Sequence, residues 1–258
     1  MSERVQKIIA QWGIASRRQA EQMILAGRVR LNGSPAELGQ KADPRSDRIE
    51  IDGVQIRPSD RPKPIYLLLN KPRGVVSTCS DPQNRKTVLD LLPAELRNDS
   101  GLHTVGRLDV ASTGALLLTN DGDVTFSLTH PSHSITKVYH VWVQGNPSPR
   151  TLQQWRNGVL LDGRLTRPAE VRVLATRPPN QTLLEIILQE GRNRQIRRLA
   201  EQFGHPVVCL HRVSIGPIQL EQLPLGHYRW LNQREINFLQ QQAKQPGQSR
   251  ARPYPKQG

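Results

Sequence analysis

Residues 105–123 read VGRLDVASTGALLLTNDGD, and this stretch decides the fold of the larger part of the chain. Small and polar residues around Asp109 lead into an unbroken apolar run at 115–118, which an Asn-Asp-Gly turn follows. A short apolar run bounded by turn signals is typical of a buried strand. Asp109 therefore precedes a strand. Its carboxylate either accepts backbone N–H groups in a turn or performs chemistry.

Outward from this stretch, strand and helix signals alternate. Apolar or alternating runs between Gly and Pro turns predict four strands, at residues 66–70, 114–119, 137–144 and 182–189. Apolar residues at helical spacing predict four helices, at residues 87–92, 122–128, 151–157 and 194–203. Together they predict an α+β domain over residues 65–240, with a mixed, largely antiparallel sheet.

Residues 1–57 form a separate small unit in this interpretation. Apolar residues at helical spacing predict a first helix, and Ser16 with Gln19 fits the capping box of a second one. An alternating strand then ends in an Asn-Gly turn at 32–33, and another enters an Asp-Gly hairpin at 52–53. The unit is thus predicted to be two helices followed by a small β-ribbon.

Composition marks two further boundaries. Residues 58–64 contain three prolines, which suits a semi-rigid linker. Residues 241–258 are rich in Gln, Pro and basic side chains and almost free of apolar ones, which predicts a disordered basic tail.

The 258-residue chain is strongly basic, with 36 Lys and Arg against 22 Asp and Glu and a formal charge of +14. This charge predicts an anionic partner, for which RNA, DNA and acidic lipid all qualify. The apolar runs are far shorter than the roughly 20 residues that cross a bilayer. The N-terminus also lacks a secretory signal, so we expect a cytoplasmic protein without a membrane partner.

The sequence offers little for metals or disulfides. Cys79 and Cys209 form no CxxC pair, so we expect two buried, inert thiols. His130 and His133 lie in a Pro- and Ser-containing stretch without a partner ligand, and we interpret them as part of a loop. No metal and no cofactor are predicted.

The N-terminal unit resembles a known RNA-binding fold. Residues 3–33, RVQKIIAQWGIASRRQAEQMILAGRVRLNG with the preceding Glu3, resemble the S4-like RNA-binding domain. Four arginines gather around its second helix and the following strand: Arg17, Arg18, Arg28 and Arg30. By themselves they are typical of a solvated helix face. The resemblance implies that they bind structured RNA through its phosphates and shape.

The rest of the chain resembles pseudouridine synthases that act on ribosomal RNA. Residues 105–123 are similar to the GRLD signature of that family. Its other motifs match at NKPRGVVST (70–78), at Asp81 with TVLDLLP (87–93), at HPS (130–132) with KVYHV (137–141), and at EGRNRQIRR (190–198). With the S4-like domain, the resemblance covers roughly nine-tenths of the chain.

The resemblance implies roles for individual residues. Asp109 is expected to be the nucleophile and Arg197 to hold its carboxylate charged. Tyr139 is expected to stack on the target base, where its hydroxyl could assist removal of the C5 proton. Whether Asp109 adds to C1′, adds to C6 or removes a sugar proton stays open. Arg107 is expected either to fill the space that the flipped uridine leaves or to contact a phosphate. Three further arginines are expected to contact phosphate: Arg192, Arg194 and Arg198.

The motif departs from its commonest form, GRLDxNTxGLLLxTNDG. Ala111 stands where Asn is usual, Ser112 where Thr is usual, and Ala115 where Leu is usual. These changes affect the hydrogen bonds of the loop and the fit of the substrate, whereas Asp109 and Gly114 are unchanged.

We therefore expect a cofactor-free, monomeric enzyme that isomerises one uridine in a structured rRNA hairpin. The motifs are closer to the large-subunit members of the family than to the small-subunit members. The substrate is either free RNA or an assembling ribosome. One alternative is a non-catalytic ribosome-assembly factor. A DNA-binding protein fits the charge but lacks a motif that reads the major groove.

Overall fold

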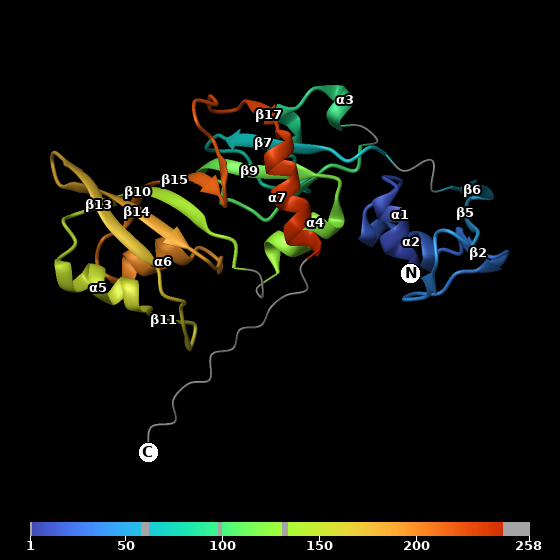
Figure 1. Ribbon diagram of the computed structural model, residues 1–258, viewed down its shortest axis with the longest axis horizontal. Helices are drawn as coiled ribbons and strands as arrows, with labels where there is room; N and C mark the ends of the chain where they lie inside the picture. The colour runs from blue at the N-terminus through green and yellow to red at the C-terminus, as the bar shows by residue number, and fades with distance from the viewer. Residues whose placement is uncertain (1, 58–61, 98–99, 131–133, 245–258) are drawn as a thin grey trace, which may run out of the picture. The chain divides into compact units, whose positions relative to one another are not determined.

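The computed structural model describes residues 2–57, 62–97, 100–130 and 134–244 (Figure 1). Most of the predicted linker, Pro131 and Ser132 of the HPS motif, and residues 245–258 of the predicted tail lie outside these ranges. Within them, no helix combines the length and the apolar character that a membrane span requires.

The chain divides into two compact units. Their boundaries differ from the single boundary predicted at 58–64, because each unit contains several segments of the chain. The first comprises Met1–Tyr66, Leu89–His103 and Leu118–Gly122. The second comprises Leu67–Val88, Thr104–Leu117 and Asp123–Gly258. Asn120 connects the three segments of the first unit. Its side chain accepts from the Ile65 N–H (2.9 Å) and donates to the carbonyls of Lys63 and Ser100 (both 3.0 Å).

The first unit begins with the predicted helices and ribbon. Helices α1 (Val5–Gln11) and α2 (Arg17–Leu25) pack on each other, and the Ser16–Gln19 capping box is present. A four-stranded sheet follows in the order β3-β2-β5-β6. Its strands are β2 (Val29–Leu31), β3 (Ser34–Pro35), β5 (Ile49–Ile51) and β6 (Val54–Ile56). Two short strands, β1 (Glu3–Arg4) and β4 (Lys41–Ala42), pair with each other.

A nine-stranded sheet dominates the rest of the chain, with main order β13-β14-β10-β15-β9-β7-β17. The main strands are β7 (Tyr66–Lys71), β9 (Thr113–Thr119), β10 (Lys137–Gln144), β13 (Glu170–Arg177), β14 (Gln181–Leu188), β15 (Val207–Ile215) and β17 (Tyr228–Trp230). Two short strands join its side, β8 (His103–Val105) and β16 (Ile218–Gln219). Strand β10 is antiparallel to both neighbours and β9 is parallel to β15, which confirms the predicted mixed sheet.

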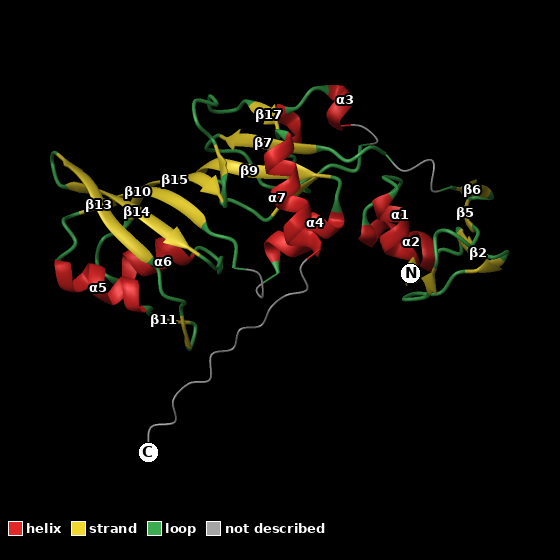
Figure 2. Cartoon of the chain, in the orientation of Figure 1, coloured by secondary structure: helices red, strands yellow, loops and turns green. Residues whose placement is uncertain are grey.

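Helices lie between these strands along the chain (Figure 2). They are α3 (Ala94–Arg97), α4 (Gly122–Thr129), α5 (Pro149–Asn157), α6 (Gln195–Gln202) and, after the last strand, α7 (Gln233–Lys244). Helix α5 contacts β13 and helix α6 contacts β15. A small hairpin, β11 (Leu160–Leu161) with β12 (Arg164–Leu165), follows α5. The helix predicted at 87–92 is only a 3₁₀ turn, Leu89–Leu91.

Helix α7 corrects the predicted start of the tail, because it continues to Lys244. It begins with a capping box that the sequence did not lead us to expect. The Asn232 side chain accepts from the Glu235 N–H (3.0 Å), and Glu235 accepts from the Asn232 N–H (2.9 Å). Glu235 also pairs with Arg229 at 2.7 Å, and Leu239 is 1% exposed. These contacts hold the helix, whose last four residues, 241–244, fall within the predicted tail.

Candidate active site

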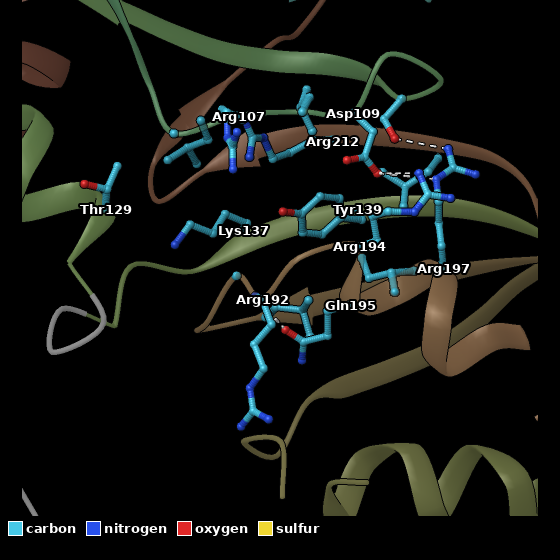
Figure 3. A pocket seen from close by; sticks show the side chains of 18 of the residues that line it. Arg107, Asp109, Thr129, Lys137, Tyr139, Arg192, Arg194, Gln195, Arg197 and Arg212 are labelled. Carbon is cyan, nitrogen blue, oxygen red and sulfur yellow. Dashed lines mark hydrogen bonds and ion pairs between the residues drawn. The ribbon is translucent and has the colours of Figure 1, made fainter. Parts of the chain in front are cut away.

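A cavity of about 220 Å³ lies in the second unit, between the loop before β9, strands β10 and β15, and the start of α6 (Figure 3). Asp109, Tyr139 and Arg197 all line it. Three segments far apart in the sequence thus bring the predicted catalytic side chains together.

Backbone contacts fix the loop that carries Asp109. The Ser77 hydroxyl accepts from the Leu108 N–H (3.2 Å) and donates to the Leu108 carbonyl (2.8 Å). The Gly74 N–H binds the Val110 carbonyl at 2.8 Å. Residues of the NKPRGVVST stretch therefore hold the positions on both sides of Asp109.

Lys71 holds the same loop from inside the protein. Its side chain is fully buried, and Nζ donates to the carbonyls of Pro72 (3.0 Å), Asp109 (3.2 Å) and Ser112 (3.0 Å). Burial lowers the pKa of Lys71 to about 8, and the Asp109 charge opposes this shift. Three carbonyls need three N–H donors, which only the ammonium form supplies.

We therefore expect turnover at saturating RNA to fall as pH rises through 8. Below that pH Lys71 is protonated and the loop is held, whereas the neutral amine loses one donor and its charge. With a pKa of about 8, the protonated fraction falls roughly fivefold between pH 8 and pH 9. The measurement is kcat against pH, with Lys71→Met as the comparison. If kcat of Lys71→Met falls above pH 8 as it does in the wild type, the loss of the Lys71 proton is not the cause of the fall.

Two arginines lie beside the Asp109 carboxylate. Arg194 Nη1 is 3.5 Å and Arg197 Nε is 3.7 Å from Asp109 Oδ2, and the carboxylate is one-third exposed. The position of Arg197 matches the predicted pairing. Arg194, expected to contact phosphate, was not expected here. It precedes α6 in the left-handed backbone conformation (φ 49°), a feature that the letters of the motif do not reveal.

Arg197 also holds the loop. Its Nη2 donates to the Ala111 carbonyl and to the Ser112 hydroxyl, both at 3.1 Å. Burial lowers the pKa of Arg197, and the Asp109 charge opposes the shift, yet a guanidinium stays protonated in any working range. Ser112 is 1% exposed. Ala111 and Ser112 stand where Asn and Thr are usual. The Ala111 carbonyl and the Ser112 hydroxyl therefore accept the hydrogen bonds of Arg197.

The orientation of Arg197 follows from the packing of α6. Ile196, Leu199 and Ala200 are buried on one face of this helix, as their spacing predicts. Phe203, which follows the helix, lies with its ring centroid 5.6 Å from that of Trp155. This packing directs Arg197 to the cavity.

Tyr139 lies on β10 with 8% of its surface exposed, and its ring stands in the cavity (Figure 3). Its partner in the register is Arg212 on β15. Strand β15 approaches β9 very closely at Gly114, where an added Cβ would lie 2.2 Å from the Arg212 carbonyl oxygen. Only glycine fits this position, and φ of +110° also favours it.

The other residues predicted to contact RNA lie in different surroundings. Arg107 is exposed at the cavity. Arg192 donates to the carbonyls of Leu161, Arg164 and Leu165, so it holds the β11–β12 hairpin. The Arg198 guanidinium pairs with Asp162, outside the cavity.

In the first unit, Arg28 pairs with Asp52 at 2.6 Å. Arg17, Arg18 and Arg30 are exposed.

Both cysteines, Cys79 and Cys209, are exposed, which contradicts the prediction of buried thiols. Strand alternation explains Cys209, since its neighbour Leu210 is the residue that β15 buries. His133 lies outside the described residues. Among those described, no three His, Cys, Asp or Glu side chains gather as metal ligands would.

Comparison with known proteins assigns the class. The pattern of the RNA pseudouridylate synthase family matches residues 65–202, and that of the S4 domain matches residues 3–49. The chain belongs to the RNA pseudouridylate synthase family and is an enzyme of the isomerase class with an S4 domain at its N-terminus.

Individual relatives cover nearly the whole chain. A ribosomal large subunit pseudouridine synthase B of Bacillus subtilis (strain 168) is 39% identical over 92% of this chain and 95% of its own. An uncharacterized RNA pseudouridine synthase of Mycobacterium tuberculosis is 42% identical, over 92% and 93% respectively. A crystal structure of a pseudouridylate synthase matches with a TM-score of 0.66 at 31% identity, over 92% of this chain and 99% of that one.

Proposed function

We propose that this protein converts a specific uridine of large-subunit ribosomal RNA to pseudouridine, with Asp109 as the nucleophile. The observation that carries the proposal is the Asp109 carboxylate at a cavity next to Arg194 and Arg197. The large-subunit substrate rests on the names of relatives such as the Bacillus subtilis protein. We infer that the enzyme acts in the cytoplasm as a monomer.

The proposed chemistry needs no external atom. The N1–C1′ bond breaks, the uracil turns, C5 bonds to C1′, and the proton that leaves C5 is balanced by one gained at N1. A carboxylate supports such a reaction by attacking the nucleotide or by stabilising positive charge at C1′, as in glycosidases. In this proposal Tyr139 stacks on the uracil. Arg194 and Arg197 pair with the carboxylate and balance its negative charge as the base displaces water.

The test incubates the protein, without added metal or cofactor, with unmodified transcripts of large- and small-subunit rRNA. Carbodiimide labelling and reverse-transcription stops then map pseudouridine. We expect one stop in the large-subunit transcript. A stop only in the small-subunit RNA would correct the substrate. Tight binding without a stop in either RNA, or in rRNA of assembly intermediates, would favour a non-catalytic assembly factor.

The S4 domain is proposed to anchor the RNA through exposed arginines. Arg17→Ala with Arg18→Ala should weaken rRNA affinity about tenfold, because each residue contacts a phosphate. The slope of log affinity against log salt should decrease by roughly 0.9 for each phosphate that is no longer neutralised, while kcat at saturating RNA stays unchanged. Filter binding at several salt concentrations measures the affinity and its slope.

A matched control for this pair is Arg150→Ala with Arg172→Ala, which removes the same charge from exposed positions of the second unit. It should leave the slope nearly unchanged. Equal reductions of affinity in the two double variants would mean that Arg17 and Arg18 act only through net charge.

A further inference from the structure

The cavity carries more positive charge than the proposed reaction uses. Six cationic side chains but one carboxylate line it. Arg194 and Arg197 lie beside that carboxylate, Asp109. Lys137 and Arg212 have no carboxylate partner among the residues that the structure describes (Figure 3).

Arg212 is a buried cation, and one of its guanidinium nitrogens makes no hydrogen bond within the described residues. The residue is 5% exposed, and its Nε donates to the Ala115 carbonyl at 2.6 Å. Its Nη2 is buried and has no hydrogen-bond partner in the described part of the chain. A buried donor without an acceptor is costly, which indicates that an acceptor arrives with a ligand.

Lys137 extends this positive charge. It lies two residues before Tyr139 on β10, so both side chains project from the same face of the sheet, and Lys137 lies on the hydroxyl side of the tyrosine ring (Figure 3). Burial, with the charges of Arg212 and Arg167, lowers the pKa of Lys137 to about 8. An anion at this position would relieve both effects.

A second hollow of about 600 Å³ continues from the same side. It shares Lys137, Thr129 and Arg192 with the first cavity and adds the cationic side chains of Arg164 and Arg167. Two carboxylates also line it, but each pairs with an arginine, Asp162 with Arg198 and Glu190 with Arg192. Lys137 therefore lies where the two hollows meet, and with Arg164 and Arg167 it leaves the second hollow a positive charge that suits a phosphate backbone.

We propose that Lys137 and Arg212 bind a phosphodiester group of the RNA next to the uridine that enters the cavity. The strand then continues through the second hollow. This inference rests on the proposed function for the position of the uridine. Uracil carbonyls accept hydrogen bonds but carry no net charge, whereas a phosphodiester supplies two free oxygens and the negative charge that the buried Arg212 and the half-buried Lys137 need.

The first test requires no turnover. Affinity for the unmodified large-subunit rRNA transcript is measured against salt for the wild type and Lys137→Met. Affinity should fall about tenfold and the salt slope by roughly 0.9, as expected when one phosphate is no longer neutralised. Lys137→Arg should restore both, and Lys86→Met, at an exposed lysine outside both hollows, should change neither. An unchanged slope in Lys137→Met overturns the proposal.

The second test uses an oligonucleotide around the mapped uridine with one neutral methylphosphonate linkage beside it. Wild-type affinity should fall about tenfold for one of the two neighbouring linkages, and Lys137→Met should show no further decrease there. Equal additional decreases in both proteins overturn the inference. A wild type that makes no pseudouridine but shows the Lys137-dependent slope would refute the proposed reaction and leave the phosphate site standing.

Discussion

Asp109→Asn should abolish pseudouridine formation, with a loss of roughly 10,000-fold in kcat, while RNA binding stays intact or tightens. The carboxamide keeps the shape of the side chain but lacks the negative charge that attacks or stabilises C1′. The loop need not move, because Ser77 and Lys71 hold it through backbone atoms. Removing the single carboxylate also makes the cavity more positive.

Single-turnover assays with excess enzyme measure this effect, since they separate chemistry from RNA release. Glu170→Gln is the matched control, because an arginine, Arg172, also lies beside that carboxylate, which is on strand β13 and outside the cavity lining. It should retain full activity. Turnover in Asp109→Asn within tenfold of the wild type would contradict the proposed role of Asp109.

The sequence predicted the elements whose signals are local. The Ser16–Gln19 box begins α2, and the apolar run at 115–118 lies within buried strand β9. Residues 241–244, which were predicted to belong to the tail, continue helix α7, which begins at the Asn232–Glu235 capping box and buries Leu239. The polar composition of these four residues favours a tail, but a helix that has already begun extends through them.

The same distinction applies to the site. Asp109, Tyr139 and Arg197 were predictable from motifs, and the fold brings them to one cavity. Lys71 was within a quoted motif, yet its role depends on carbonyls about 40 residues further along the chain, which no spacing rule connects. Arg194 and Arg192 were given one role from one motif, but backbone geometry sends Arg194 to Asp109 and Arg192 to a hairpin.

Arg197→Met should reduce kcat by about 100-fold or more, with a much smaller effect on RNA affinity. Methionine keeps the length and apolar packing of the stem but removes the charge 3.7 Å from Asp109 and both donors to residues 111 and 112. Each hydrogen bond from a charged group contributes about 1.5–3 kcal/mol. The loss of two such bonds should therefore lower kcat more than the loss of one phosphate contact lowers RNA affinity. Arg197→Lys keeps the charge and should recover part of the activity.

Arg198→Met is the matched comparison, since the neighbouring arginine of the same helix pairs with Asp162 outside the cavity. If Arg198 contacts RNA, its removal lowers RNA affinity and reduces the slope of log affinity against log salt, but leaves kcat unchanged. The two variants should therefore separate the parameters, with kcat responding at 197 and KM at 198. Equal increases of KM in both, with kcat preserved, would mean that Arg197 contacts phosphate and that the ion pair with Arg194 is sufficient for the role of Asp109.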